Sequence, residues 1–232
     1  MRIYGGKTMK RSEINRKIRE GKAFLERMNF VVPPFVLWSP DEWKEKGHEY
    51  DEIRDCMLGW DITDFGTGDF DKTGLLVITL RNGIDGNPDY FKTYAEKCLI
   101  VQDGQVTPMH FHFFKMEDII NRGGADLMIK LYHATPERKL ADTPVTAYVD
   151  GKRFQVPAGT VLRLKPGEGI TLPPYQYHTF WAEGGTALIM EVSRVNDDNT
   201  DNHFLNAPAR FPKIEEDEMP LHLLFSEYPD AK

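Results

Sequence analysis

The sequence predicts an all-β core, built as an antiparallel sandwich or barrel, with helices before it and a long tail after it. Short runs rich in Val, Ile, Thr and aromatic residues follow one another from about residue 75 to residue 195. Turn residues separate these runs, as is typical of antiparallel strands. The strongest turn signal is Asp150-Gly151, because Asp-Gly favours a two-residue hairpin.

The length of 232 residues favours a single domain spanning residues 1–232. With 41% hydrophobic and 28% charged residues, the chain has enough apolar material to bury a core of its own. We expect residues 1–70 to form a helical decoration and residues 75–195 to form the β core. The polar residues that follow predict a tail over 196–232 that wraps the domain.

Two helices are predicted in the N-terminal decoration. Ser12 can cap a first helix, in which Ile14 and Ile18 fall on one face together with further apolar residues. The second helix has a capping-box signature, with Ser39 at the cap, Pro at the first helical position and Glu42 three residues after the cap.

The β core should contain at least seven short strands. Each run combines β-branched or aromatic residues with turn residues at its ends. The predicted strands cover residues 75–80, 97–102, 127–132, 145–149, 154–156, 161–164 and 187–192.

Composition narrows the classes of partner and the compartment. The net charge is -7, and no basic stripe is present that could neutralise a phosphate backbone, so we expect no nucleic-acid partner. Two cysteines cannot form a disulfide framework, which fits a reducing compartment. No run approaches the roughly 20 apolar residues of a membrane span. We therefore expect a cytoplasmic protein that does not bind membranes.

Three histidines and one glutamate predict a metal site. His110 and His112 are separated by one residue, and on a strand such residues point to the same face. Glu117 follows after a four-residue step that can bend the chain back, and His178 begins a strand after a proline turn. Three imidazoles and a carboxylate suit a divalent first-row ion with positions left for water or substrate.

The spacing around these ligands resembles the two motifs of the cupin superfamily. Residues 104–124 read G-x5-H-x-H-x4-E-x6-G, which is similar to the first motif. The second motif is matched at Gly167, Pro173 and His178. Tyr175 stands where Gly is usual and Ala182 where Asn is usual, so the turn of the second motif is in doubt. The resemblance implies a jelly-roll-like antiparallel β-barrel with the metal inside.

From Met9 onward the chain also resembles the D-lyxose isomerase family. The similar segments are 10–15, 59–66, 94–97, 107–124, 191–198 and 210–218. The resemblance implies an aldose-ketose isomerase that interconverts D-lyxose and D-xylulose, with activity on D-mannose and D-fructose. It further implies a homodimer and Mn2+ as the usual ion, with Co2+, Zn2+ and Fe2+ as alternatives.

Isomerisation moves a proton between adjacent carbons, and three residues are candidates for this chemistry. Lys115 and Glu117 lie next to the predicted ion, and Glu191 shares a strand face with apolar residues of the core. A carboxylate directed into a barrel needs a partner or a function. Each of these interpretations has an alternative. Lys115 could instead be a solvated loop lysine, and Glu191 could lie on the outer face of its strand. The reaction itself could be a metal-assisted hydride shift in place of a proton transfer.

Three further residues are candidates for binding the substrate. Lys97 opens a strand just before the metal segment and could reach a substrate hydroxyl or pair with an acidic neighbour. Arg210 and Glu215 lie in the tail, where they could close the pocket.

Three other functions use the same ligand set. A cupin oxidase or dioxygenase would use manganese or iron with oxygen, and a non-catalytic cupin would only bind sugar. An isomerase of a phosphorylated sugar would need cations for the phosphate, and Lys97, Lys115 and Arg122 could supply them.

Overall fold

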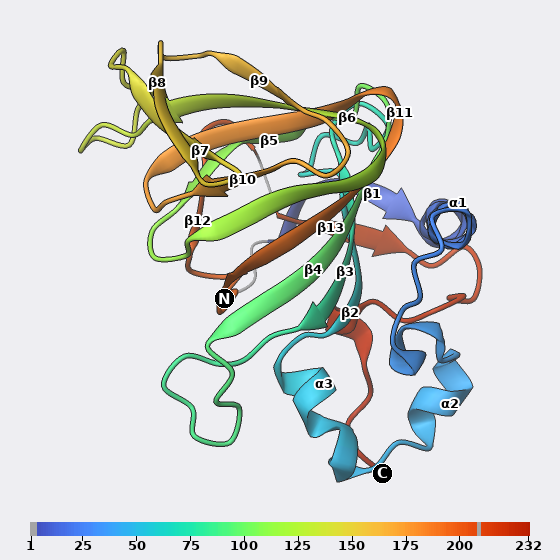
Figure 1. Cartoon of the computed structure of the whole chain (residues 1–232). Helices are drawn as coiled ribbons and strands as arrows, with labels where there is room; N and C mark the ends of the chain where they lie inside the picture. The colour runs from blue at the N-terminus through green and yellow to red at the C-terminus, as the bar shows by residue number, and fades with distance from the viewer. Residues whose placement is uncertain (1–3, 208–209) are drawn as a thin grey trace.

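A mainly antiparallel β-sheet forms the centre of the molecule (Figure 1). The computed structural model describes residues 4–207 and 210–232. The predicted fold class is confirmed, since a β core follows N-terminal helices and precedes a long tail. The helices are α1 (Arg11–Arg27), α2 (Pro40–Lys44) and α3 (Asp51–Asp55), with 3-10 turns η1 (Pro34–Leu37), η2 (His48–Tyr50) and η3 (Phe225–Glu227).

The strands of the described residues belong to two sheets. The small sheet pairs β1 with β13 in parallel, and the large sheet runs β2-β3-β4-β11-β6-β10-β7-β8, with β5, β9 and β12 paired beside this path. Pairing among the described strands leaves the barrel open between β2 and β8. The strands are β1 (Tyr4–Lys10), β2 (Gly59–Thr63), β3 (Leu75–Arg81), β4 (Tyr94–Val101), β5 (Thr107–His112), β6 (Glu117–His133), β7 (Val145–Val149), β8 (Lys152–Val156), β9 (Val161–Leu164), β10 (Gly169–Leu172), β11 (Gln176–Arg194), β12 (Asn202–Phe204) and β13 (Phe211–Glu215).

The two faces of the large sheet pack into two hydrophobic cores. Alternate residues of β11 divide between them, because successive side chains of a strand point to opposite faces. Ile189 belongs to the inner core, with Leu127 and Ile129, whereas Leu188 belongs to the outer core under α1. Each fully buried Ile or Leu stabilises the fold by about 1.5–3 kcal/mol. The inner face also carries the polar residues described below.

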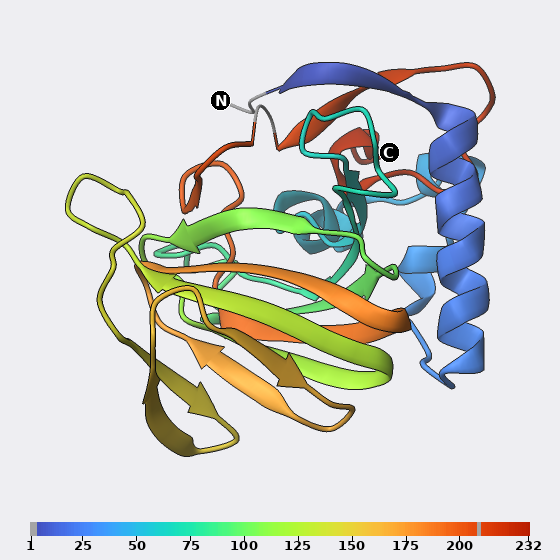
Figure 2. The same cartoon turned by 90° about the horizontal axis from the view of Figure 1, so that it is seen from above.

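Helix α1 stands beside the sheet and covers its outer face (Figure 2). Ile14 and Ile18 are buried as the spacing predicts. The prediction that Ser12 caps this helix is wrong, because the cap position is Lys10 and Ser12 lies inside the first turn. Ser12 instead donates from its backbone amide and its hydroxyl to the Asp217 carboxylate of the tail. The tail therefore replaces the local cap.

The capping box and the strongest hairpin are confirmed. Ser39 accepts from the Glu42 amide while the Glu42 carboxylate accepts from the Ser39 amide, and α2 begins between them. Asp150 and Gly151 form the turn between β7 and β8 with φ values of 47° and 79°. Both values are positive, as the favoured two-residue hairpin turn requires.

Two strands lie in the range expected to be helical, residues 1–70. Strand β1 contains adjacent glycines and pairs with β13, about two hundred residues away in the chain, so no local pattern marks it. Strand β2 has five residues and forms one end of the large sheet. The large sheet thus begins before residue 75.

The tail wraps the molecule as expected and is anchored to α1. Arg11 is buried and forms ion pairs with Glu216 and Glu227. Strand β13 runs beside β1 (Figure 2). In residues 4–207 and 210–232, no helix combines the length and apolar character that crossing a membrane demands.

Candidate metal centre

Strand pairing brings the four predicted metal ligands together. Strands β5 and β11 are antiparallel, and their register places His110 opposite His178. His112 lies two residues further along β5 on the same face, and Glu117 begins β6 after the predicted bend. All four side chains are buried, and one ligand atom from each lies within 4.8 Å of the others. The geometry therefore matches a single shared ion.

Backbone and aromatic contacts orient the histidine rings. The Nδ1 atoms of His110 and His178 lie 2.8 Å and 3.0 Å from the carbonyl oxygens of Pro108 and Gln176. Protonation at these nitrogens leaves each Nε2 with a lone pair, as a metal ligand requires. Phe204 stacks on the His110 ring with centroids 5.1 Å apart.

Several buried polar atoms of the centre lack hydrogen-bond partners among the described residues. Such atoms show whether the residues present could hold a metal ion. The Oε1 atom of Glu117 lies 3.2 Å from His112 Nε2 and 3.0 Å from His178 Nε2, yet none of the three forms a hydrogen bond with a described residue. Buried polar atoms without partners are costly. A divalent ion would satisfy all three, so the residues fit the metal that the sequence predicts.

Charge states at the centre also suit a cation. Burial and the neighbouring imidazoles lower the pKa of His110, and burial and Lys115 lower the pKa of His112. Burial alone would raise the pKa of Glu117, but Lys115 and His112 bring it well below its ordinary value. Neutral imidazoles and an ionised carboxylate are the forms that bind metal.

Lys115 lies beside the metal cluster between two carboxylates. Its Nζ atom is 2.9 Å from Glu117 Oε2 and 2.7 Å from Glu191 Oε1, and the side chain is only 3% exposed. It is therefore not a solvated loop lysine. Burial would lower the pKa of Lys115, but the charges of Glu117 and Glu191 raise it above its ordinary value.

Glu191 and Lys97 extend this charged network along the inner face of the sheet. Glu191 points inward, as its strand position predicts, and its Oε1 lies 3.5 Å from Lys97 Nζ. Lys97 also donates to the Asn196 side-chain oxygen at 2.5 Å. Burial would raise the pKa of Glu191, but Lys115 and Lys97 lower it. Of the two alternatives for Lys97, the structure shows the pairing with an acidic neighbour.

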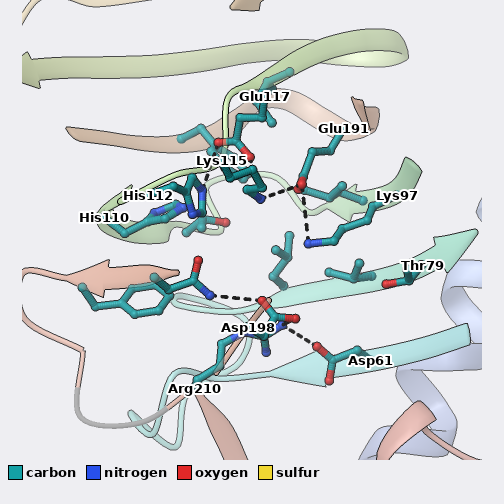
Figure 3. A pocket seen from close by; sticks show the side chains of 18 of the residues that line it. Asp61, Thr79, Lys97, His110, His112, Lys115, Glu117, Glu191, Asp198 and Arg210 are labelled. Atoms are coloured by element: carbon teal, nitrogen blue, oxygen red, sulfur yellow. Dashed lines mark hydrogen bonds and ion pairs between the residues drawn. The ribbon is translucent and has the colours of Figure 1, made fainter. Parts of the chain in front are cut away.

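A second polar group lies across the cavity from the metal cluster (Figure 3). Arg210 forms ion pairs with Asp61 at 2.6 Å and with Asp198 at 3.4 Å. Burial raises the pKa of Asp61, whereas for Asp198 the charge of Arg210 overcomes burial and lowers the pKa far below its ordinary value. Sequence analysis missed both aspartates because β2 and the tail meet only in the folded chain.

A cavity that is partly open to solvent lies between these two groups. Both charged groups line it, together with apolar side chains such as Phe65 and Phe180. The Thr107 hydroxyl is buried in its wall without a hydrogen-bond partner among the described residues. A small polyhydroxylated molecule could therefore contact the metal cluster and the Arg210 group together.

Glu215 does not belong to this site. Its carboxylate is about half exposed and lies 3.9 Å from Lys10 on the β1–β13 sheet. Strand β13 places it outside the residues that line the cavity. The structure thus places Glu215 outside this cavity.

Comparison with known proteins identifies relatives along almost the entire chain. The model of the D-lyxose isomerase family matches residues 9–228. D-lyxose/D-mannose isomerases of Serratia proteamaculans and Escherichia coli O157:H7 are each 47% identical over 223 residues, covering 95% of this chain and 98% of theirs.

Solved structures of more distant proteins share the fold. A mutant L-ribose isomerase of Acinetobacter sp. DL28, in complex with L-ribose, superposes with a TM-score of 0.59 at 14% identity, covering 91% of this chain and all of the other. The L-ribose isomerase of Geodermatophilus obscurus gives 0.55 at 16% identity, covering 90% of this chain and 99% of the other. At this identity the likeness concerns the fold alone.

Proposed function

Because the chain belongs to the D-lyxose isomerase family, we propose that it interconverts D-lyxose and D-xylulose, and also D-mannose and D-fructose, with a divalent metal. Two relatives at 47% identity carry the name D-lyxose/D-mannose isomerase. The observation that carries the proposal is the buried cluster of three histidines and Glu117, with Lys115 and Glu191 in the same cavity.

The residues His110, His112, Glu117 and His178 would hold the metal. Their mixed nitrogen and oxygen donors suit Mn2+, and Co2+, Zn2+ and Fe2+ accept the same set. A divalent ion supplies, when bound, positive charge next to the oxygens of the enediolate that forms between C1 and C2.

Glu191 is the best-placed base for the proton transfer. Glu117 is committed to the metal cluster, and Lys115 is held as an ammonium between two carboxylates. Glu191 would take the proton from C2 of the aldose and return it to C1, while the hydroxyl proton of O2 is transferred to O1, which yields the ketose. Lys115 would donate a hydrogen bond to a substrate oxygen and stabilise negative charge there.

The far end of the cavity favours an unphosphorylated sugar. Arg210 is already paired with two carboxylates, and these would repel a phosphate dianion. Lys97 and Lys115 are paired with Glu191, and Arg122 is exposed outside the cavity lining. We propose that Arg210, Asp61 and Asp198 bind sugar hydroxyls. The guanidinium can donate hydrogen bonds to a hydroxyl, and the two carboxylates can accept hydrogen bonds from it.

The test is ketose formation from D-lyxose, D-mannose and mannose 6-phosphate, with oxygen consumption followed in parallel. The proposal predicts ketose from the two free sugars, little from the phosphate and no oxygen uptake. Conversion of the phosphate alone would assign a sugar-phosphate isomerase, and metal-dependent oxygen uptake without ketose would assign an oxidase. Metal binding with neither product would leave a sugar-binding protein.

We further propose a homodimer that acts in the cytoplasm, on the basis of the family resemblance. Sedimentation equilibrium would give about twice the chain mass of 26.7 kDa for the dimer. A species of single-chain mass at micromolar concentration would contradict it.

A further inference from the structure

We propose that Asp201 is a positioning residue, which fixes the catalytic turn that carries Lys115 through two backbone hydrogen bonds. The turn, residues 113–116, connects β5 to β6 and thus separates His112 from Glu117. The inference rests on the proposed isomerase function, because it assigns Asp201 an effect on that reaction. Asp201 itself does not line the cavity that holds the metal cluster.

Both carboxylate oxygens of Asp201 are used on this turn. The Phe114 amide donates to Oδ1 at 2.7 Å, and the Lys115 amide donates to Oδ2 at 3.0 Å. The Asp201 carbonyl also accepts from the Phe113 amide at 3.1 Å. Consecutive amides are thus held by one buried residue, and hydrogen bonds to an ionised acceptor are stronger than neutral ones.

The centre of the turn needs an anchor beyond the packing of Phe113 against Phe111 and Tyr175 at its start. Phe114 is 72% exposed, so little side-chain packing fixes the backbone at this point. Lys115 is the next residue, and its ammonium must reach Glu117 and Glu191 at 2.9 Å and 2.7 Å. The anchor therefore sets the direction in which the Lys115 side chain leaves the backbone.

The metal ligands are held by strand pairing that does not use the Asp201 carboxylate, and for His112 this pairing is with Asn202 of β12. Glu117 pairs with Leu172 of β10 and Ser193 of β11, and the β5–β11 register fixes His110 and His178. Loss of the Asp201 carboxylate should therefore displace Lys115 while the metal cluster stays intact. This separation distinguishes a positioning role from a general structural one.

Asp201→Asn is the informative variant, because it keeps the shape of the side chain. An amide offers one oxygen and one NH2 group, so one of the two backbone amides would face a donor. We expect kcat for D-lyxose to fall by about 10- to 100-fold, as for misplacement of a catalytic group. KM and the Mn2+ dissociation constant should stay within about threefold.

The control is Asp197→Asn, on the same segment. The Asp197 carboxylate accepts from the Asn199 amide and the Thr200 hydroxyl, inside its own loop. This variant should keep the kcat of the wild type. If Asp201→Asn does not fold, Asp201→Ser replaces it, since its small side chain leaves room for water at both amides.

A double-mutant cycle with Lys115→Met tests whether Asp201 acts through Lys115. We expect Asp201→Asn to have no further effect on kcat in the Lys115→Met background. The proposal would be overturned if the losses in kcat of the two single variants multiplied in the double variant. It would also be overturned if kcat of Asp201→Asn stayed within twofold of the wild type, or if Asp201→Asn lost Mn2+ binding.

Hydrogen exchange of the Phe114 and Lys115 amides provides a readout that does not depend on activity. Both amides should exchange slowly in the wild type and in Asp197→Asn, and at least tenfold faster in Asp201→Asn. Equal exchange rates in all three proteins would overturn the anchor even if no sugar is converted. A wild type with slow exchange but no isomerase activity would contradict the proposed function alone.

Discussion

Replacing Glu191 by Gln tests the role of Glu191 as the base and leaves the groups around it in place. Gln has nearly the same shape and keeps an oxygen for the Lys115 ammonium, which lies 2.7 Å away, but it cannot take up the C2 proton. The change also removes the negative charge that Lys97 and Lys115 share. The variant should therefore bind metal and substrate but convert the sugar slowly.

The size of the effect follows from the role of a base. General acid-base catalysis contributes about 10²- to 10⁴-fold. At about 1.36 kcal/mol per factor of ten, this is a loss of about 2.7–5.4 kcal/mol of transition-state stabilisation. The effect on folding should be smaller, about 1–3 kcal/mol, the scale of one hydrogen bond to a charged group. Lys115 keeps Glu117 as a counter-ion, and Lys97 keeps the Asn196 oxygen.

The assay is ketose formation from saturating D-lyxose by protein loaded with Mn2+, with the bound metal counted in each sample. Glu96→Gln is the matched control, because Glu96 lies on β4 beside Lys97 and pairs with Arg81 on the outer face. We expect kcat of Glu191→Gln to fall by at least 100-fold and that of the control to stay unchanged. A kcat for Glu191→Gln within threefold of the wild type would refute the assignment of the base.

Three further predictions concern the charged groups of the cavity. Arg210→Leu leaves Asp61 and Asp198 buried without their cation, so the free energy of unfolding in urea should fall by about 3–5 kcal/mol; an unchanged urea midpoint would contradict this. The folded pKa of Asp198 lies below its unfolded value, so its contribution to stability is full above about pH 5 and is lost as the pH falls. Asp198→Asn should therefore be less stable than the wild type at pH 7, and the difference should begin to narrow below about pH 4 with most of it still present at pH 3, measured by urea unfolding; a constant difference would disprove the linkage. Mn2+ at 100 times its dissociation constant should stabilise the wild type by about 2.7 kcal/mol, and His178→Ala should lose most of this gain in a thermal melt; an equal gain in both would place the ion elsewhere.

The side-by-side placement of His110 and His112 could be predicted from sequence because its geometry is local. One intervening residue on a strand puts His110 and His112 on the same face whatever the rest of the fold does. The capping box at Ser39 is predictable for the same reason, since cap and partner are three residues apart. Where an interaction closes within a few residues, the sequence pattern is sufficient.

Interactions between residues far apart in the chain could not be predicted, because no local sequence pattern marks them. Asp61 comes from β2, whereas Asp198 and Asp201 come from the tail, and only the folded chain brings them to the cavity and its catalytic turn. Strand β1 was missed because its partner is β13. The Ser12 cap was wrong because α1 begins one residue before Ser12, whose amide and hydroxyl donate to the distant Asp217.

Tyr175 shows how a departure from a family pattern can be compensated. It stands where Gly is usual and adopts φ of 60°, a left-handed conformation that costs roughly 1 kcal/mol for a residue with a side chain. Its ring packs against Phe111 at 5.3 Å and Phe113 at 5.9 Å, which offsets this cost. Packing thus permits a residue with a side chain at this left-handed position.

Metal-dependent isomerisation is tested most directly by protein freed of metal with a chelator and then reloaded with Mn2+. D-Xylulose formation from D-lyxose is measured for the wild type and for His178→Ala in both states. Product is expected only from the reloaded wild type, with one ion bound per chain. Product of equal yield from the metal-free protein, or from His178→Ala, would contradict it.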